Sequence, residues 1–504
     1  MKVIKRDGRA VEYDRAKIEI AIEKANNEVY GNKKATKKEI KEIINYIEKL
    51  DRKRILVEDI QDIIEQKLME IHKYELAKKY IVYRYTRALV RKANTTDESI
   101  LGMIRNGTIE NEKGEIISKN ITASIQREYI AGEVSKDLTK RMLLPEKIVK
   151  AHEEGILYFH DAEHFVQPIC RNSVINLEDM LENGTVINDM IIETPKRFES
   201  ACLAMSQIME NIASNQYGSQ AIDSKCLGKY LKKSEDKLES EELVKEELKQ
   251  GIQIIKYQLN TLMAIHGQLS CVKIYLHIEK DDPYLEQNKK IIKEFLKQYI
   301  EGMKNIKQEC EFQDYLKFIY VIQDDIQKSE EEFLKIYTEV TDYAKKCEKQ
   351  GCPIMFVNMS EESNNKKGEN LIQLGTFSQG KVSINLSQIA TVSEGKENIF
   401  WQLLKERLEL CYEALMCRHY ALKGTVSDIS PIHWQYGAIS RLKKGETINK
   451  LLYDGNSTLS LGYIGLEEME KIMKKNLKEK VIKYMQNTVQ NWTKQTDILF
   501  IVED

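Results

Sequence analysis

Hydrophobic residues in the first ninety positions follow two different periods. Residues 3–13 alternate apolar and polar side chains on either side of Asp7-Gly8, which predicts two short strands joined by a tight turn. Further on, apolar residues recur three and four positions apart, which is typical of helices packed on one face. These helical stretches are centred on Ile18–Ala25, Ile40–Ile47, Ile60–Leu68 and Leu76–Tyr85. The pattern predicts a small domain over 1–93, a hairpin capped by about four helices.

Polar residues become dense over 94–119, where Asn106-Gly107 and Lys113-Gly114 are turn signals, so we place a linker there. The remaining residues, 120–504, alternate short apolar runs with long amphipathic stretches. The runs predicted as strands are 272–278, 318–322, 354–358, 381–386 and 499–502, and the main predicted helices are 235–265 and 398–422. Strands alternating with helices predict an α/β fold with a parallel or mixed sheet, in one arrangement a barrel.

Composition narrows the class of protein. The 504 residues include 77 Lys+Arg and 79 Asp+Glu, a formal net charge of −2, which argues against a basic nucleic-acid-binding module. The longest apolar runs, near 318–322 and 353–357, are far shorter than the roughly 20 residues that a membrane helix needs. Residues 1–12 mix charged and apolar positions, unlike a secretory signal. We therefore expect a cytoplasmic protein without membrane or nucleic-acid partners.

Cysteine and histidine residues do not form a metal-binding pattern. The nine cysteines are scattered without a Cys-x-x-Cys pair, and the eight histidines are dispersed without a His-Glu-x-x-His motif. The sequence therefore predicts no bound metal.

Basic residues near the hairpin are candidates for a phosphate site. Lys5 and Arg6 flank the turn, Lys17 opens the next helix and Arg87 closes the domain. A lysine ammonium and an arginine fork could converge on a triphosphate. From spacing alone, solvated surface charges are the alternative interpretation.

The same segment resembles the ATP-cone, a regulatory domain of ribonucleotide reductases. The resemblance is carried by Val3-x-Lys5-Arg6-Asp7-Gly8, Lys17-Ile18 and Val57-Glu58-Asp59-Ile60-Gln61. It implies binding of ATP or dATP, with Mg²⁺ accompanying the triphosphate. It also implies that Val3, Lys5, Arg6 and Lys17 line the nucleotide site, with Arg87 in place of a usual lysine.

The rest of the chain resembles the large component of class III, anaerobic ribonucleotide reductases. The matching motifs, in family order, include Gln126–Gly132, Tyr158–Asp161, His266–Gln268, Val382–Leu386 and Ser460–Gly465. The resemblance implies an α/β barrel of ten strands, here incomplete, and a reaction on ribonucleoside triphosphates.

That reaction begins when a cysteine thiyl radical removes a hydrogen atom from the ribose, so the resemblance implies two cysteine positions inside the barrel. Thr376 occupies the first position, within Leu374–Ser378, and Asn172 occupies the second. Cys170 lies two residues earlier on the same strand face, about 7 Å away, and is a candidate displaced thiol. A misalignment around Thr376 is an open alternative. Cys347 and Cys352 are expected to be core residues.

In the family, a zinc ribbon and a loop bearing the radical glycine follow the segment matched by Gly465. The sequence ends at Asp504 with no glycine in that context, so we expect neither zinc nor a glycyl radical, and Glu503-Asp504 as a solvated terminus. His160-Asp161 is either a substrate-lining or a structural pair. Ser457–Gly465 is a candidate phosphate-binding loop before a helix.

Together these features predict an ATP- or dATP-binding relative of the reductase that is unable to reduce ribonucleotides alone. It would act as a regulatory or assembly subunit, as a homodimer or in a mixed oligomer with a complete reductase. One alternative is a subunit of a split reductase whose radical glycine comes from a second polypeptide. Another is a decayed fragment.

Overall fold

The structure is a computed structural model of the full chain. The residues it describes are 2–4, 10–27, 29–50, 54–85, 100, 109–110, 116–118, 123–262, 264, 271–304, 310–311, 316–322, 331–352, 354–358 and 373–503. The chain divides into two compact units, the N-terminal unit (Met1–Asn106) and the C-terminal unit (Gly107–Asp504). The division falls inside the segment 94–119 that the sequence suggests as a linker.

The N-terminal unit is a small sheet covered by helices. Its strands are β1 (Lys2–Ile4), β2 (Ala10–Glu12) and β3 (Arg54–Leu56), and its helices are α1 (Arg15–Asn26), α2 (Lys37–Glu48), α3 (Val57–Glu70) and a helix over 74–85. Strand order is β2-β1-β3, with β1 antiparallel to β2 and parallel to β3. The predicted hairpin and helices are confirmed, while the turn at Asp7-Gly8 lies outside the described residues.

Local sequence explains where these helices begin and which face they bury. Thr36 caps α2 by accepting from the Glu39 N–H, and the Glu39 carboxylate accepts from the Thr36 backbone N–H at 2.6 Å. The helix then buries Ile40, Ile44 and Ile47 in the core of the N-terminal unit. The 3.6-residue period seen in the sequence is therefore the period of burial.

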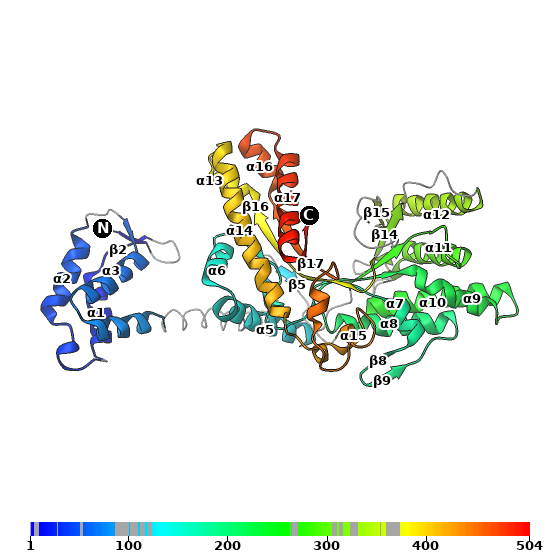
Figure 1. Ribbon diagram of the computed structural model, residues 1–504, viewed down its shortest axis with the longest axis horizontal. Coiled ribbons are helices and arrows are strands. Elements are labelled where there is room, and N and C mark those ends of the chain that lie inside the picture. The colour runs from blue at the N-terminus through cyan, green and yellow to red at the C-terminus, as the bar shows by residue number, and fades with distance from the viewer. Residues whose placement is uncertain are drawn as a thin grey trace. The chain divides into compact units, whose positions relative to one another are not determined.

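The C-terminal unit is built on a nine-stranded sheet (Figure 1). Its strands are β6 (Leu157–Phe159), β7 (Ser173–Val174), β10 (Gln220–Asp223), β11 (Val272–Leu276), β14 (Leu316–Ile322), β15 (Ile354–Asn358), β16 (Thr376–Asn385), β17 (Ser457–Ile464) and β18 (Leu499–Glu503). The order is β15-β14-β11-β10-β7-β16-β17-β18, with β6 also pairing with β16. All five predicted strands are confirmed.

Two parallel sets of strands meet at one antiparallel junction. Strands β7, β10, β11, β14 and β15 run parallel to their neighbours, as do β16, β17 and β18. The two sets join where β16 pairs antiparallel with β7 through Thr376↔Val174 and Phe377↔Ser173. Residues from both sets are thereby brought together at the start of β16.

Helices flank this sheet, and short hairpins form separate two-stranded sheets. The helices are α5 (Ala123–Leu138), α6 (Glu146–Glu153), α7 (Leu177–Asn183), α8 (Phe198–Ala213), α9 (Gly228–Glu235), α10 (Glu241–Thr261), α11 (Leu285–Glu301), α12 (Glu331–Lys349), α13 (Leu386–Val392), α14 (Glu397–Leu422), α15 (Pro431–Trp434), α16 (Leu466–Met473) and α17 (Lys478–Thr496). The hairpins are β4 (Ile109–Glu110) with β5 (Ile116–Ser118), β8 (Thr185–Ile187) with β9 (Met190–Ile192), and β12 (Met303–Lys304) with β13 (Cys310–Glu311).

Two sequence predictions about these elements were wrong. The helix predicted over 235–265 begins only at Glu241, where Ser240 caps α10 by accepting from the Leu243 N–H. The segment predicted as a phosphate-binding loop, Ser457–Gly465, is mostly strand β17. Its serines and glycines resemble a loop composition, but they alternate with buried leucines along a strand that pairs on both edges.

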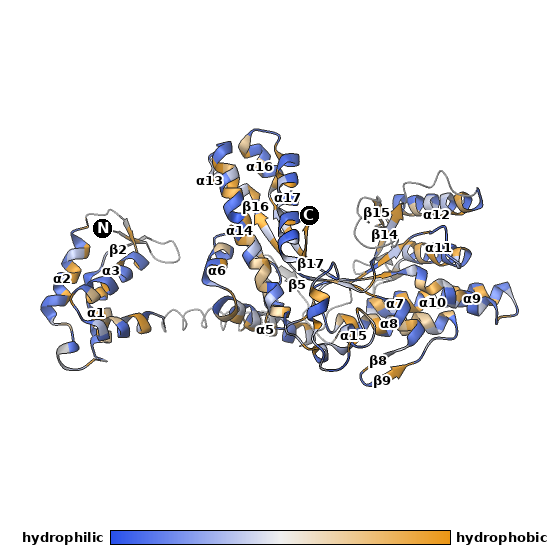
Figure 2. Cartoon of the chain, in the orientation of Figure 1, coloured by the Kyte–Doolittle hydropathy of each residue, from blue (hydrophilic) through white to orange (hydrophobic). Residues whose placement is uncertain are grey.

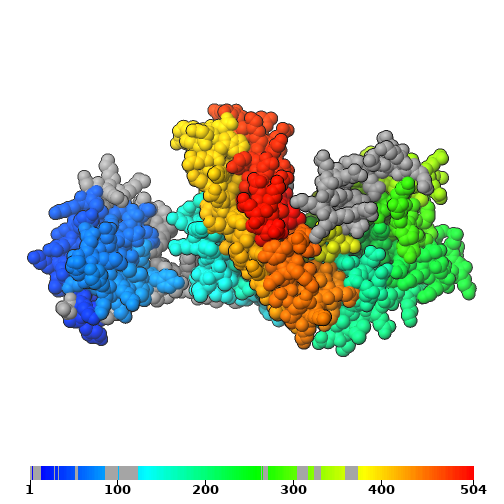
Figure 3. Space-filling model, viewed as in Figure 1, coloured from blue at the N-terminus to red at the C-terminus, as the bar shows by residue number. Residues whose placement is uncertain are grey.

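The hydrophobic core of the C-terminal unit follows the two strand sets. One cluster packs helices such as α8, α10 and α11 against β10, β11 and β14, and another packs α13, α14, α16 and α17 against β16, β17 and β18. Figure 2 shows hydrophobic and hydrophilic residues alternating along these helices. In Figure 3 the yellow and red helices of the second cluster form one continuous surface. Among the described residues, no helix is both long and apolar enough to cross a membrane.

Candidate functional site

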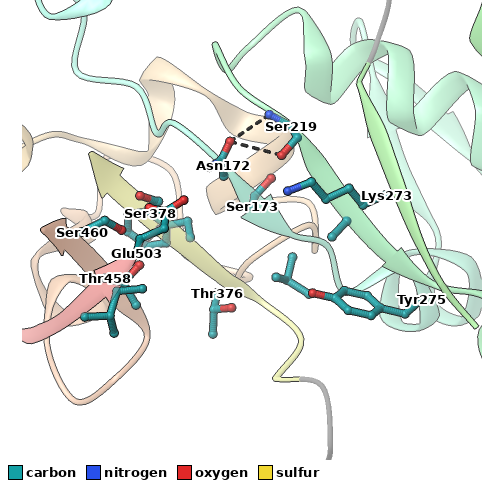
Figure 4. Close-up of a pocket in the computed structure, with 14 residues that line it drawn as sticks. Asn172, Ser173, Ser219, Lys273, Tyr275, Thr376, Ser378, Thr458, Ser460 and Glu503 are labelled. Carbon is teal, nitrogen blue, oxygen red and sulfur yellow. Dashed lines mark hydrogen bonds between the residues drawn. The ribbon is translucent and has the colours of Figure 1, made fainter. Parts of the chain in front are cut away.

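A cavity of about 270 Å³ lies where the two strand sets meet (Figure 4). Its lining comes from β7, β10, β11, β16, β17 and β18 and from residues just outside them. The lining residues are Asn172, Ser173, Val174, Ser219, Ala221, Lys273, Tyr275, Thr376, Phe377, Ser378, Thr458, Ser460, Ile501 and Glu503. We call this cavity the sheet pocket. Hydroxyl groups dominate its polar surface, which suits hydrogen bonding to a polar ligand.

The two residues at the expected cysteine positions, Thr376 and Asn172, both line the sheet pocket. Asn172 is fixed by its side-chain oxygen, which accepts from the Ser219 backbone N–H at 2.9 Å. The Thr376 hydroxyl donates to the Gln373 carbonyl at 2.9 Å. The structure therefore brings together two positions that lie two hundred residues apart in sequence, and gives both a local hydrogen-bond partner.

Cys170, the candidate displaced thiol, lies outside the lining of the sheet pocket. It is 1 % exposed and packs in a cluster with Phe377 and Trp434. Its thiol lies 3.8 Å from the Gln216 side-chain oxygen, and burial raises the pKa of the thiol to about 12. The neutral thiol is therefore strongly favoured at this position.

The other described cysteines are either buried or partly exposed. Cys347 and Cys352 are 2 % and 1 % exposed in the hydrophobic core, as expected. Cys271 immediately precedes β11 and is partly exposed. Because alternate strand residues share a face, it lies in line with Lys273 and Tyr275, which both line the sheet pocket. Among the described residues, no cysteine belongs to the lining itself.

Glu503 corrects another prediction, since it is not a solvated terminal residue. It ends β18, pairs with Gly462 and lines the sheet pocket. Its carboxylate lies 3.9 Å from Arg171 Nη1 and 3.8 Å from Lys381 Nζ. Asp504 lies outside the described residues. The strand pairing that holds Glu503 is long-range and could not be inferred from two acidic residues at a chain end.

His160 and Asp161 bind different partners. His160 Nε2 lies 2.8 Å from the Ser383 hydroxyl, and the Asp161 carboxylate accepts from Arg171 Nε at 2.8 Å. Asp161 has φ 53°, a left-handed conformation that turns its side chain away from the path of the strand. Neither residue lines the sheet pocket: His160 connects the end of β6 to β16, and Asp161 connects it to Arg171, just before β7.

Burial and nearby cations keep His160 neutral. Desolvation lowers the pKa of His160 to about 4, and the positive charges of Arg171, Lys381 and Arg418 act in the same direction, while Asp161 opposes them. The histidine therefore contributes a hydrogen bond and no charge at neutral pH.

The candidate nucleotide residues of the N-terminal unit are only partly described. Val3 is 9 % exposed and packs in the core of the unit. Lys17 is exposed and lies 3.7 Å from the Asp14 carboxylate. Lys5, Arg6 and Arg87 lie outside the described residues.

Several lining residues were not singled out from the sequence. Lys273 and Tyr275 come from β11, where the sequence gives only the alternation of a strand, and Ser219 directly precedes β10. When both faces of a strand are covered, its sequence shows no separate polar face. The sequence therefore does not indicate which of its residues line a pocket.

Comparisons with known proteins agree with this architecture. Residues 116–504 match the family model for anaerobic ribonucleoside-triphosphate reductase, and residues 1–89 match the ATP cone domain. The anaerobic ribonucleoside-triphosphate reductase of Haemophilus influenzae is 28 % identical over 99 % of this chain and 76 % of its own length. That of enterobacteria phage T4 is 29 % identical over 81 % of this chain and 72 % of its own length.

Solved structures share the fold. The anaerobic ribonucleotide reductase from Thermotoga maritima in complex with dATP and CTP aligns with a TM-score of 0.56 at 15 % identity, covering 75 % of this chain and 68 % of that one. The mixed sheet and its covering helices are thus an α/β barrel-type fold, preceded by an ATP-cone. Because the family model matches residues 116–504, well over half of the chain, the chain belongs to the anaerobic ribonucleoside-triphosphate reductase family.

Proposed function

We propose that this chain is a nucleotide-binding member of the family that does not reduce ribonucleotides by itself. It binds ATP or dATP, with Mg²⁺, through its N-terminal unit and acts as a regulatory or assembly subunit. In that role it forms a homodimer or joins a complete reductase.

The observation that supports this proposal is the lining of the sheet pocket. Thr376 and Asn172 stand at the two positions where the family resemblance implies cysteines, and no described lining residue carries a thiol. A hydroxyl O–H bond is much stronger than a thiol S–H bond, so Thr376 is unsuited to carry the radical that removes a hydrogen atom from ribose. The deeply buried Cys170 is held away by its own packing.

Nucleotide binding rests on the match of residues 1–89 to the ATP cone domain. A related structure, the anaerobic ribonucleotide reductase from Thermotoga maritima, has been solved with dATP in its specificity site. Lys17 offers an exposed ammonium at the start of α1, directly after the β1–β2 hairpin.

The experiment is equilibrium binding of ATP and dATP to the full chain, with and without Mg²⁺. Lys5→Ala/Arg6→Ala should abolish saturable binding, because it removes two cations from the proposed triphosphate site. The matched control is Lys37→Ala/Lys38→Ala, which removes two exposed lysines from α2 in the same unit. Equal affinity in both double variants would refute the site assignment.

One observation favours the alternative of a split reductase. Cys271 is partly exposed and lies in line with the pocket residues Lys273 and Tyr275. A second polypeptide that supplied a radical could then find a thiol near the pocket. Under this alternative, deoxynucleotides form only when the second polypeptide is added, and Cys271→Ser abolishes them while Cys352→Ser does not.

A further inference from the structure

Charged side chains gather at the carboxyl ends of the parallel strands β10 and β11. Asp223 ends β10 and Lys225 lies in the turn after it, while His277 and Glu279 directly follow β11. His277 is 2 % exposed, and each of its ring nitrogens faces a carboxylate. We propose that this cluster is a pH-sensitive switch, in which a doubly protonated His277 connects the segment after β11 to the end of β10 and loses this connection when the ring becomes neutral.

Both ring nitrogens of His277 lie near groups that only accept hydrogen bonds. Nε2 lies 2.9 Å from the Glu279 carboxylate, and Nδ1 lies 3.5 Å from the Asp223 carboxylate, an ion-pair distance. A neutral imidazole carries a hydrogen on one nitrogen and a lone pair on the other, and an ionised carboxylate has no hydrogen to donate. In the neutral ring one lone pair would therefore face a carboxylate, whereas the imidazolium presents an N–H to each.

The surrounding charges favour the imidazolium. Glu279 also forms an ion pair with Lys225, and the Asp223 carboxylate accepts from the Lys225 backbone N–H at 2.9 Å. Two carboxylates thus face one lysine, and the protonated ring supplies the second positive charge of the cluster. From neighbouring elements, the carboxyl group of Glu178 in α7 acts on Asp223, and that of Asp282 acts on Lys225.

These contacts raise the pKa of the ring. Burial lowers the pKa of His277, but the charges of Asp223 and Glu279 and the hydrogen bond to Glu279 raise it above the ordinary value of 6.5, against the charge of Lys225. The same hydrogen bond lowers the pKa of Glu279 to about 2. The folded ring therefore keeps its proton at a pH where a solvent-exposed histidine has lost it.

The segment 277–284 is the part of the chain that the switch controls. It connects β11, which carries two residues of the sheet pocket, to α11. His277 holds the start of the segment, and near its end the Asp282 carboxylate accepts from the Tyr284 backbone N–H at 2.8 Å. With a neutral ring the start is held less strongly, so the segment opens more often and its amides exchange faster.

The direction of the pH dependence follows from the raised pKa. The stabilising contribution of His277 is complete below the pKa of the open segment, about 6.5, and is lost as pH rises through the higher pKa of the closed segment. Because one proton is linked to opening, the protection of the segment against exchange should fall by up to about tenfold per pH unit in this window.

The test combines two measurements on the full chain. The first is an NMR titration of the imidazole groups of its eight histidines, in which the signal missing from His277→Gln identifies the ring. That signal should have the shift of an imidazolium at pH 7, and Glu279→Gln should move its midpoint to lower pH. The second is hydrogen exchange over 277–284, corrected for the intrinsic rate, whose protection should fall with rising pH in the unmodified chain and become independent of pH in His277→Gln.

The matched control is His433→Gln, which removes another buried histidine, one that burial keeps neutral by lowering its pKa to about 3. It should leave both measurements unchanged above pH 6. If His277→Gln does not fold, Glu279→Gln decides, because the Glu279 side chain is 24 % exposed and the amide keeps a hydrogen-bond acceptor. The one histidine signal that this variant moves then identifies the ring. A neutral ring at pH 7, an unchanged midpoint in Glu279→Gln, or protection independent of pH in the unmodified chain would overturn the proposal.

Discussion

Replacing Gly380 by alanine tests how Arg418 reaches its buried position. Gly380 has φ +145°, a conformation that L side chains rarely adopt, and an added Cβ would lie deep inside van der Waals contact with the Arg418 side chain. Gly380→Ala therefore imposes backbone strain and a steric clash at the same residue. The buried arginine has little room to give way, since it packs against Phe159 and Phe165.

The expected loss of stability is the sum of two effects. Strained backbone at one residue costs about 1–3 kcal/mol, and overpacking of a core costs about 1–3 kcal/mol. Gly380→Ala should therefore lower the free energy of unfolding of the C-terminal unit by about 2–6 kcal/mol. The matched control is Gly424→Ala, at φ +87° with no atom within 4 Å of the added Cβ, which should show the strain alone.

The chain offers a selective signal for this measurement. All three tryptophans, Trp401, Trp434 and Trp492, belong to the C-terminal unit, and each packs in or against its hydrophobic clusters. Tryptophan fluorescence during urea unfolding therefore follows this unit without a contribution from the N-terminal unit. The difference between the midpoints of the two alanine variants, multiplied by the m-value, gives the energy of the clash.

An equal loss of stability in the two glycine variants would refute this reasoning, because it would mean that Arg418 does not lie against Gly380.

Three further predictions concern stability and assembly. Ile44→Ala, at a fully buried position in the separate N-terminal core, should destabilise that unit by about 2–5 kcal/mol; hydrogen exchange over 37–48 should rise while the tryptophan-monitored midpoint stays unchanged. Burial lowers the pKa of His433 to about 3, below its unfolded value of about 6.5, so its contribution to stability is complete above pH 6.5 and is lost as pH falls toward 3. The urea midpoint should fall on acidification, and His433→Gln should flatten that dependence. Light scattering at tens of micromolar with and without dATP should detect a dimer, and a strict monomer in both conditions would contradict the proposed assembly.

The sequence predicted the elements better than their contacts. The helix around Ile40–Ile47 in α2 and the strand Ile354–Asn358 in β15 were predicted correctly, because each depends on a pattern of neighbouring residues in the sequence. Ser457–Gly465 was misread because its small polar residues are common to loops and to strands that line a cavity. Local composition does not record whether a segment has strand partners on both sides.

The candidate site shows the same limit. Thr376 and Asn172 were placed from motif order, and the structure brings both to one pocket. The sequence did not indicate Arg418 or Glu503. The position of Arg418 depends on its packing against Gly380, and that of Glu503 depends on the pairing of β18 with β17. Contacts between residues far apart in the sequence depend on tertiary packing and cannot be predicted from the periodicity of the sequence.

The most direct test of the proposed function is an anaerobic turnover assay with the full, unmodified chain. The chain is supplied with a radical-activating enzyme, formate or thioredoxin as reductant, and each of the four ribonucleoside triphosphates, and deoxynucleotides are quantified by chromatography. Because the described lining of the sheet pocket holds Thr376 and Asn172 and no thiol, the account predicts no deoxynucleotide product. Formation of deoxynucleotides by this chain alone would contradict it.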